Sequence, residues 1–198
     1  MKTEYKEFGF YRIDIDYVRF LHSKDSQVFY VAAAGYEKKP YLGIIATLGE
    51  HSYCIPLSSA KPRHLQWRNI TEHNYLIYEI IQGNDIRKSD IYRQIGKDED
   101  DRYKKIQAIL DLRKMIPVHE SLYSRIVFDD VDDNKYRGLL LKEYAFLVPH
   151  KEGILHRAKN IYIKQKESSV VERFHCNFTL LEAALSEYMI SGAAAPGS

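Results

Sequence analysis

The sequence lacks several features that would indicate other classes of protein. It has only 2 cysteines in 198 residues, Cys54 and Cys176, without metal-ligand spacing, so neither a disulfide framework nor a cysteine-bound metal is indicated. No glycine-rich phosphate loop is present, which argues against a nucleotide-hydrolysing enzyme. No apolar run approaches the length of a membrane span, and the polar start of the chain is unlike a signal peptide. We therefore expect a reduced, cytoplasmic protein with no membrane contact and no cofactor.

Clustered carboxylates that could hold a divalent ion are also scarce. The one dense group is the run from Asp129 to Asp133, for which we identify no histidine and no distant acidic partner. A catalytic Mg²⁺ or Zn²⁺ site draws its ligands from several positions that meet in space. We interpret the run as a solvated segment before a helix and predict no metal site.

The overall composition is that of one soluble globular domain. Hydrophobic residues make up 45% and charged residues 28% of the chain, and no Pro/Gly/Ser-rich linker divides it. We expect a single domain over residues 1–190. The last stretch, SGAAAPGS at 191–198, has the composition of a flexible or artificial tail, and we leave it out of the fold.

Strand patterns come early in the chain and helix patterns come late. The expected strands cover 10–16, 27–34, 41–48, 52–57, 75–81 and 108–118, with a short apolar piece at 17–21. The expected helices are a short exposed one within 84–105, then 136–147, 151–165 and 180–189, the last opened by a capping box of Thr179 and Glu182. This order favours an α+β fold, in which an antiparallel sheet is packed by helices.

The strand pair at 41–57 leads into a polar, basic loop. Gly49 and Glu50 are typical of the turn of an antiparallel hairpin, and Pro56 should end the second strand because it lacks the N–H that a central ladder needs. Loops held by a rigid scaffold often carry catalytic groups, so we take this loop as the candidate catalytic region. Its two hydroxyls and three possible cations are Ser58, Ser59, Lys61, Arg63 and His64.

Charge and aromatic content favour a nucleic acid as the partner. Residues 1–70 and 135–198 are basic overall and residues 71–134 are acidic, although the net charge of the chain is only +2. The chain also has 16 Tyr, 8 Phe and 1 Trp. RNA is held by cations along its phosphates and by aromatic rings that stack on its bases. Ordinary solvated faces and a tyrosine-rich core would give the same composition, so that interpretation stays open on composition alone.

Four groups of residues, spread over nearly the whole chain, form a recognisable series. They are Phe10, Tyr11, Ile13, Tyr17, Val18, Phe20 and Leu21; Lys39, Pro40, Tyr41, Leu42 and Gly43, followed by Pro56, Leu57, Ser58, Ser59, Ala60, Lys61 and His64; Met115, Ile116 and Pro117; and Cys176, Asn177, Phe178, Thr179, Leu180, Leu181 and Glu182. In this order they resemble the toxins of type III toxin–antitoxin systems, the ToxN/AbiQ family.

The resemblance implies a fold, an activity and partners. The fold is a single domain with a strongly twisted, barrel-like antiparallel sheet surrounded by helices. The activity is that of a bacterial endoribonuclease toxin, which cleaves RNA at specific sequences without a metal and serves in abortive infection of phage-infected cells. The expected partners are cellular or phage RNA as substrate and a small structured RNA antitoxin. That antitoxin inhibits the toxin, is processed by it from a repeated precursor and closes with it into a cyclic assembly, so no protein antitoxin is expected.

The resemblance also implies roles for catalytic residues. Lys61 would place a cation against the scissile phosphate, and Lys39 would contact the same phosphate or transfer a proton. Ser59, beside Ser58, would orient a phosphate oxygen. Tyr36 is the nearest counterpart of the family's active-site tyrosine, one residue closer to Lys39 than in the family. Which group is the general base and which the general acid stays open.

Further residues are expected to bind RNA. Arg63 stands where some relatives carry an aromatic residue, and it can stack or bind phosphate, while Trp67 can stack on a base. The helix expected at 151–165 is rich in lysine and should follow the RNA backbone. The full set of expected RNA contacts is Tyr17, Arg63, His64, Trp67, Lys159 and Lys164.

Two other classes of function remain as alternatives. The first is a noncatalytic RNA-binding module that uses the same basic and aromatic surface. The second is a β-barrel protein-interaction domain, for which no salt-dependent affinity for RNA is expected.

Overall fold

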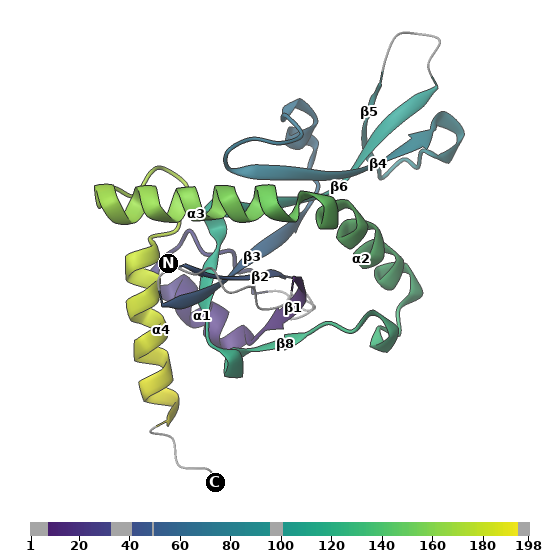
Figure 1. Cartoon of the computed structure of the whole chain (residues 1–198). Coiled ribbons are helices and arrows are strands. Elements are labelled where there is room, and N and C mark those ends of the chain that lie inside the picture. Colours follow the sequence, from purple (N-terminus) through teal and green to yellow (C-terminus); the bar gives the residue numbers. More distant parts are fainter. Residues whose placement is uncertain (1–7, 33–40, 49, 96–100, 194–198) are drawn as a thin grey trace.

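An antiparallel sheet forms the centre of the fold (Figure 1). The computed structural model describes residues 8–32, 41–48, 50–95 and 101–193. The 8 strands of this sheet run in the order β4-β6-β3-β2-β1-β8, with β5 paired to β6 and β7 paired to β3. Their bounds are β1 Gly9–Ile13, β2 Tyr41–Leu48, β3 His51–Ser59, β4 Asn74–Gln82, β5 Ile91–Gln94, β6 Arg102–Asp111, β7 Ile116–Val118 and β8 Tyr123–Arg125.

Helices pack around this sheet. Within the described ranges they are α1 (Ile15–Lys24), α2 (Asn134–Leu147), α3 (Lys151–Ser168) and α4 (Phe178–Ala193). Figure 1 shows α3 running across the view, with α2 and α4 descending from its two ends. The predicted α+β class is confirmed, but the strand path from β4 to β8 does not close on itself, so the sheet is twisted without being a closed barrel. In the described part of the chain, no helix has both the length and the apolar content to cross a membrane.

Strand β3 changes partners at Pro56. On the side of β3 away from β2, residues Ser52 to Cys54 pair with β7, and Leu57 to Ser59 pair with β6. Pro56 lies opposite Tyr41 of β2 and falls in the gap between those two ladders. Its missing N–H therefore costs no ladder hydrogen bond. The prediction that the strand ends near Pro56 is wrong, because β3 continues to Ser59.

Buried aromatic rings join α3 and α4 to the sheet. The ring of Tyr53 on β3 meets Tyr162 of α3 edge-on at 5.5 Å and Phe178 of α4 edge-on at 5.8 Å. The hydroxyls of Tyr53 and Tyr162 both donate to Oε1 of Glu182, at 2.6 and 2.8 Å. One carboxylate thus satisfies two buried hydroxyls and fixes both helices against β3.

The last helix is capped differently from the prediction. Oδ1 of Asn177 accepts the backbone N–H of Leu180 at 3.1 Å, so Asn177 caps α4. Thr179 and Glu182 do not form the predicted capping box, because the ammonium of Lys166 donates to both side chains, at 3.2 and 2.8 Å. The helix extends to Ala193, four residues beyond its predicted end at 189.

Other stretches also differ from the prediction. The apolar piece at 17–21 lies in α1, whose first turn is capped by Asp14 through the backbone N–H of Tyr17 at 2.8 Å. Residues 27–32 form no strand, and 33–34 lie outside the described residues. The polar stretch 84–105 contains β5 and the start of β6 in place of a helix, and the expected strand at 108–118 is interrupted by a 3₁₀ turn, Leu112–Lys114.

Candidate active-site cleft

A cleft of about 480 Å³ lies beside the end of β3. Its walls are the loop after β3, the facing part of β6, residues 29–31 and α2. Leu57, Ala108 and Ile109 give it an apolar lining. The structure brings to this one cleft the residues that the sequence predicted as catalytic or RNA-binding in the loop, namely Ser58, Ser59, Lys61, Arg63, His64 and Trp67.

Backbone hydrogen bonds fix the loop that carries the cations. The N–H of Ala60 donates to the carbonyl of Gln107 at 3.1 Å, which extends the β3–β6 ladder by one residue. Pro62 then begins a 3₁₀ turn, Pro62–Gln66, where its fixed φ suits the first turn. The exposed side chain of Lys61 therefore starts from a rigid backbone position at the mouth of the cleft.

His64 holds this turn from inside. Its side chain is buried, and its Nδ1 accepts the backbone N–H of Lys61 at 2.9 Å. Burial, followed by the charges of Arg63 and Lys61, lowers the pKa of His64, so the ring is neutral and its proton lies on Nε2. The Nε of Arg63 lies 3.2 Å from that Nε2, but a protonated Nε2 cannot accept, so we interpret this as a contact without a hydrogen bond.

Arg93 braces the far side of the loop, which sequence reasoning missed. Its guanidinium donates to the carbonyls of Leu65 and Trp67, at 3.1 and 3.3 Å, and to Oδ1 of Asn69 at 2.8 Å. Lys104 of β6 donates to the same amide oxygen at 2.9 Å. Strand β5 and the start of β6, which lie in the stretch 84–105 that was predicted to contain a helix, thus hold the loop in place.

Two buried carboxyl groups line the cleft and were also missed. Asp111 is paired through two hydrogen bonds with the guanidinium of Arg113, at 2.8 and 2.7 Å. Glu143 of α2 is 4% exposed, and burial raises its pKa to about 7. The sequence could have indicated that Glu143 is buried, because it stands three residues after Leu140 and four before Leu147, on the apolar side of the helix. A carboxyl group that titrates near neutral pH is suited to give or take a proton.

Several predicted site residues lie elsewhere. Tyr17 is completely buried and its hydroxyl donates to the carbonyl of Pro117 at 2.8 Å, so it is a core residue and cannot contact RNA in this structure. Lys159 and Lys164 lie on α3 and do not line the cleft. Lys39 and Tyr36 lie outside the described residues.

The fold is shared with solved structures of bacterial toxins and antiviral proteins. The lactococcal anti-phage endoribonuclease AbiQ, of the type III toxin–antitoxin systems, aligns with a TM-score of 0.68 at 20% identity, covering 93% of this chain and 99% of AbiQ. A protein from a bacterial antiviral system regulated by a processed non-coding RNA aligns with a TM-score of 0.66 at 20% identity, covering 90% and 98%.

Sequence relatives agree with this fold. Endoribonuclease ToxN of Pectobacterium atrosepticum is 23% identical over 183 residues, which is 90% of this chain and 92% of the relative. Endoribonuclease ToxN of Bacillus thuringiensis subsp. kurstaki is 25% identical over 188 residues, which is 90% of this chain and 83% of the relative.

The shared fold and the matched sequences define a class, the toxins of type III toxin–antitoxin systems. The family model described as "Toxin ToxN, type III toxin-antitoxin system" matches residues 9–186. This chain belongs to the ToxN toxin family, and the resemblance seen in the sequence is confirmed.

Proposed function

We propose that this chain is a sequence-specific endoribonuclease toxin that acts in the bacterial cytoplasm, with cellular or phage RNA as its substrate. Both sequence relatives carry the name endoribonuclease. The observation that carries the proposal is the cleft, which gathers Ser58, Ser59 and Lys61 from one of the four segments that carry the family resemblance. Hydroxyls and a cation in one cleft can together bind the phosphate at which the RNA is cleaved.

Cleavage proceeds by attack of the 2′-OH on the adjacent phosphate, which requires a base, stabilisation of the extra negative charge and an acid for the leaving 5′-oxygen. Lys61 neutralises the charge on the phosphate, and Ser58 and Ser59 orient its oxygens. Glu143, buried against the same cleft, is a proton-transfer group. Lys39 and Tyr36 complete the proposal by family resemblance alone.

The product of this reaction carries a 2′,3′-cyclic phosphate, and no step requires a metal ion. The test is to incubate the purified protein with RNA in EDTA and to identify the new 3′ ends. Cyclic phosphate ends formed at specific sequences are expected. A folded protein that binds RNA without cleaving it would instead support the noncatalytic module. Cleavage lost in EDTA and restored by Mg²⁺ would contradict metal independence.

The proposed inhibitor is a small structured RNA. A structural neighbour with a TM-score of 0.65 and 22% identity belongs to a bacterial type III toxin–antitoxin system in which a non-coding RNA pseudoknot selectively inhibits the toxin. We infer that this chain binds such an RNA over its cleft, processes it from a repeated precursor and closes with it into a cyclic assembly, with no protein antitoxin. Arg63, His64 and Trp67 line the cleft where that RNA would lie.

A further inference from the structure

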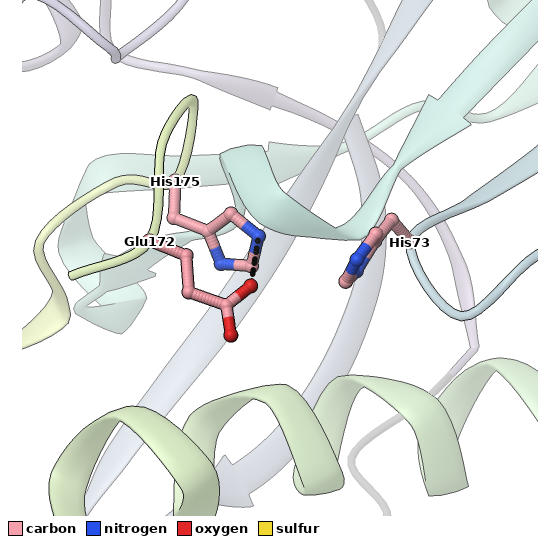
Figure 2. A group of neighbouring side chains, drawn as sticks. All are labelled: His73, Glu172 and His175. Atoms are coloured by element: carbon pink, nitrogen blue, oxygen red, sulfur yellow. Dashed lines mark ion pairs between the residues drawn. The ribbon is translucent and has the colours of Figure 1, made fainter. Parts of the chain in front are cut away.

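A second pocket, of about 260 Å³, lies between α3, the segment that follows it and the turn before β4. None of its lining residues also lines the active-site cleft. His73, Glu172 and His175 contribute to its wall, and Figure 2 shows these side chains facing one another from two loops that lie about a hundred residues apart in the sequence. The pocket takes no part in the mechanism proposed above.

The three side chains are close enough to share one ion. One ligand atom from each lies within 4.8 Å of the other two. Nε2 of His175 is 3.7 Å from Oε2 of Glu172, and the rings of His73 and His175 lie 5.1 Å apart at 82°. In a tetrahedral site with bonds of about 2.0–2.1 Å, ligand atoms are about 3.3 Å apart. Glu172, whose side chain is 40% exposed, would have to rotate to bring its carboxylate closer to the rings.

A buried nitrogen in this cluster has no partner. Nδ1 of His73 is buried and makes no hydrogen bond, which is costly for a polar atom unless something else satisfies it. His175 is 6% exposed, and its 3.7 Å contact with Glu172 is longer than a hydrogen bond. The half-buried His73 and the buried His175 therefore both have ring nitrogens near the carboxylate of Glu172 that make no hydrogen bond to a protein group.

The backbone on both sides of the cluster is fixed. The carbonyl of His73 accepts the N–H of Leu112 at 2.8 Å, and the N–H of Cys176 donates to the carbonyl of Arg113 at 2.9 Å. Phe174, directly before His175, has φ 68°, a left-handed conformation that a bulky residue adopts only when its surroundings hold it. The backbone positions of His73 and His175 are thus held by contacts that involve no metal.

We propose that His73, Glu172 and His175 bind one Zn²⁺ ion, which fastens the segment between α3 and α4 to the turn before β4. Two imidazoles and one carboxylate suit Zn²⁺ and related transition metal ions, whereas Mg²⁺ and Ca²⁺ prefer oxygen ligands. All three residues line the pocket, so a water molecule from it could supply the fourth ligand. The ion has a structural role and supplies no step of RNA cleavage.

Lys164 competes with the ion for the carboxylate. Its ammonium lies 2.7 Å from Oε1 of Glu172, on the same acid that the metal needs. Removing that cation frees the carboxylate and removes a repulsive charge. Lys164→Gln should therefore bind Zn²⁺ more tightly than the parent protein, a result that a nonspecific histidine site would not give.

The test is a titration of the chelator-treated full chain with Zn²⁺ by calorimetry, together with thermal unfolding. One ion per chain and a raised Tm are expected, with no response to Mg²⁺. His73→Asn, His175→Asn and Glu172→Gln should each weaken binding by roughly tenfold or more, since even outer-sphere changes at metal sites cost that much. His51→Asn, on β3 outside the cluster, is the matched control and should bind as the parent does.

The outcome does not depend on RNA cleavage, so it is separate from the test of the proposed function. Glu172→Gln keeps the result interpretable if a histidine variant fails to fold, because its side chain is partly exposed. Absence of stoichiometric binding in the parent protein, or equal affinity in Glu172→Gln and His51→Asn, would overturn the proposal.

Discussion

Nδ1 of the buried His64 accepts the backbone N–H of Lys61 at 2.9 Å, so the neutral histidine sets the position of the proposed catalytic cation. His64→Ala removes this acceptor, and we expect kcat to fall about 10- to 100-fold, as displacement of a positioned group does. His64→Asn, whose amide oxygen can accept the same N–H, should recover much of that loss. A role in proton transfer would instead leave both variants equally impaired, as measured by kcat for RNA cleavage.

The buried Glu143 should make the stability of the protein depend on pH. Its pKa is raised to about 7 in the folded state, so between pH 4.5 and 7 the folded chain retains a proton that the unfolded chain has released. The free energy of unfolding therefore falls as pH rises through this window, by up to about 3 kcal/mol, and levels off above it. Glu143→Gln should remove this contribution and be the more stable protein at pH 8. Urea unfolding at pH 5 and pH 8 measures it, and an identical pH dependence in both proteins would contradict the assignment.

The same substitution tests the catalytic role of Glu143. If its carboxyl group transfers a proton, Glu143→Gln should lower kcat by about 10²- to 10⁴-fold and remove the titration near pH 7 from the profile of kcat against pH. Asp111, which lies in the same cleft and is ion-paired with Arg113, provides the control: Asp111→Asn should leave the titration near pH 7 in the profile. An unchanged pH profile in Glu143→Gln would leave Glu143 as a packing residue.

The sequence predicted mainly those structural features that are determined by residues close to one another in the chain. The hairpin of β2 and β3 and the break between α2 and α3 at Pro149 were predicted, because turn residues and proline act on their immediate neighbours. The loop residues of the cleft were likewise predicted, since they follow one another along the chain. The pairing of β5 with the start of β6 was not predicted, because much of the surface of these strands is exposed and their sequences lack a clear apolar alternation.

Other parts of the site depend on contacts between distant segments. Glu143 becomes a cleft residue only because α2 packs beside β4 and shares the cleft with β6. Arg93 becomes a brace only because β5 lies beside the loop. The group of His73, Glu172 and His175 has no pattern within either segment. Tyr17 shows the opposite error, since a residue taken for an RNA contact is a core residue.

The lysines of α3 give a separate prediction about RNA affinity. Neutralising Lys159 and Lys164 together should weaken binding of the antitoxin RNA and lower the slope of log affinity against log salt by roughly 0.7–0.9 for each RNA phosphate that these lysines no longer neutralise. Cleavage should persist, because neither residue lines the cleft. RNA titrations at several salt concentrations, with Lys88→Gln as the exposed control, measure the slope. An unchanged slope would mean that these two lysines do not contact the RNA.

The central claim is that the loop after β3 cleaves RNA with Lys61 against the scissile phosphate. Loss of one such charge-stabilising group costs about 10²–10³ in kcat. The most direct measurement is bacterial growth on expression without antitoxin RNA, with Lys61→Ala compared with Lys88→Ala, an exposed lysine in the turn before β5. At matched protein levels we predict that Lys61→Ala permits growth and that Lys88→Ala stops it as the parent does. Growth arrest by Lys61→Ala equal to that of the parent would contradict the account.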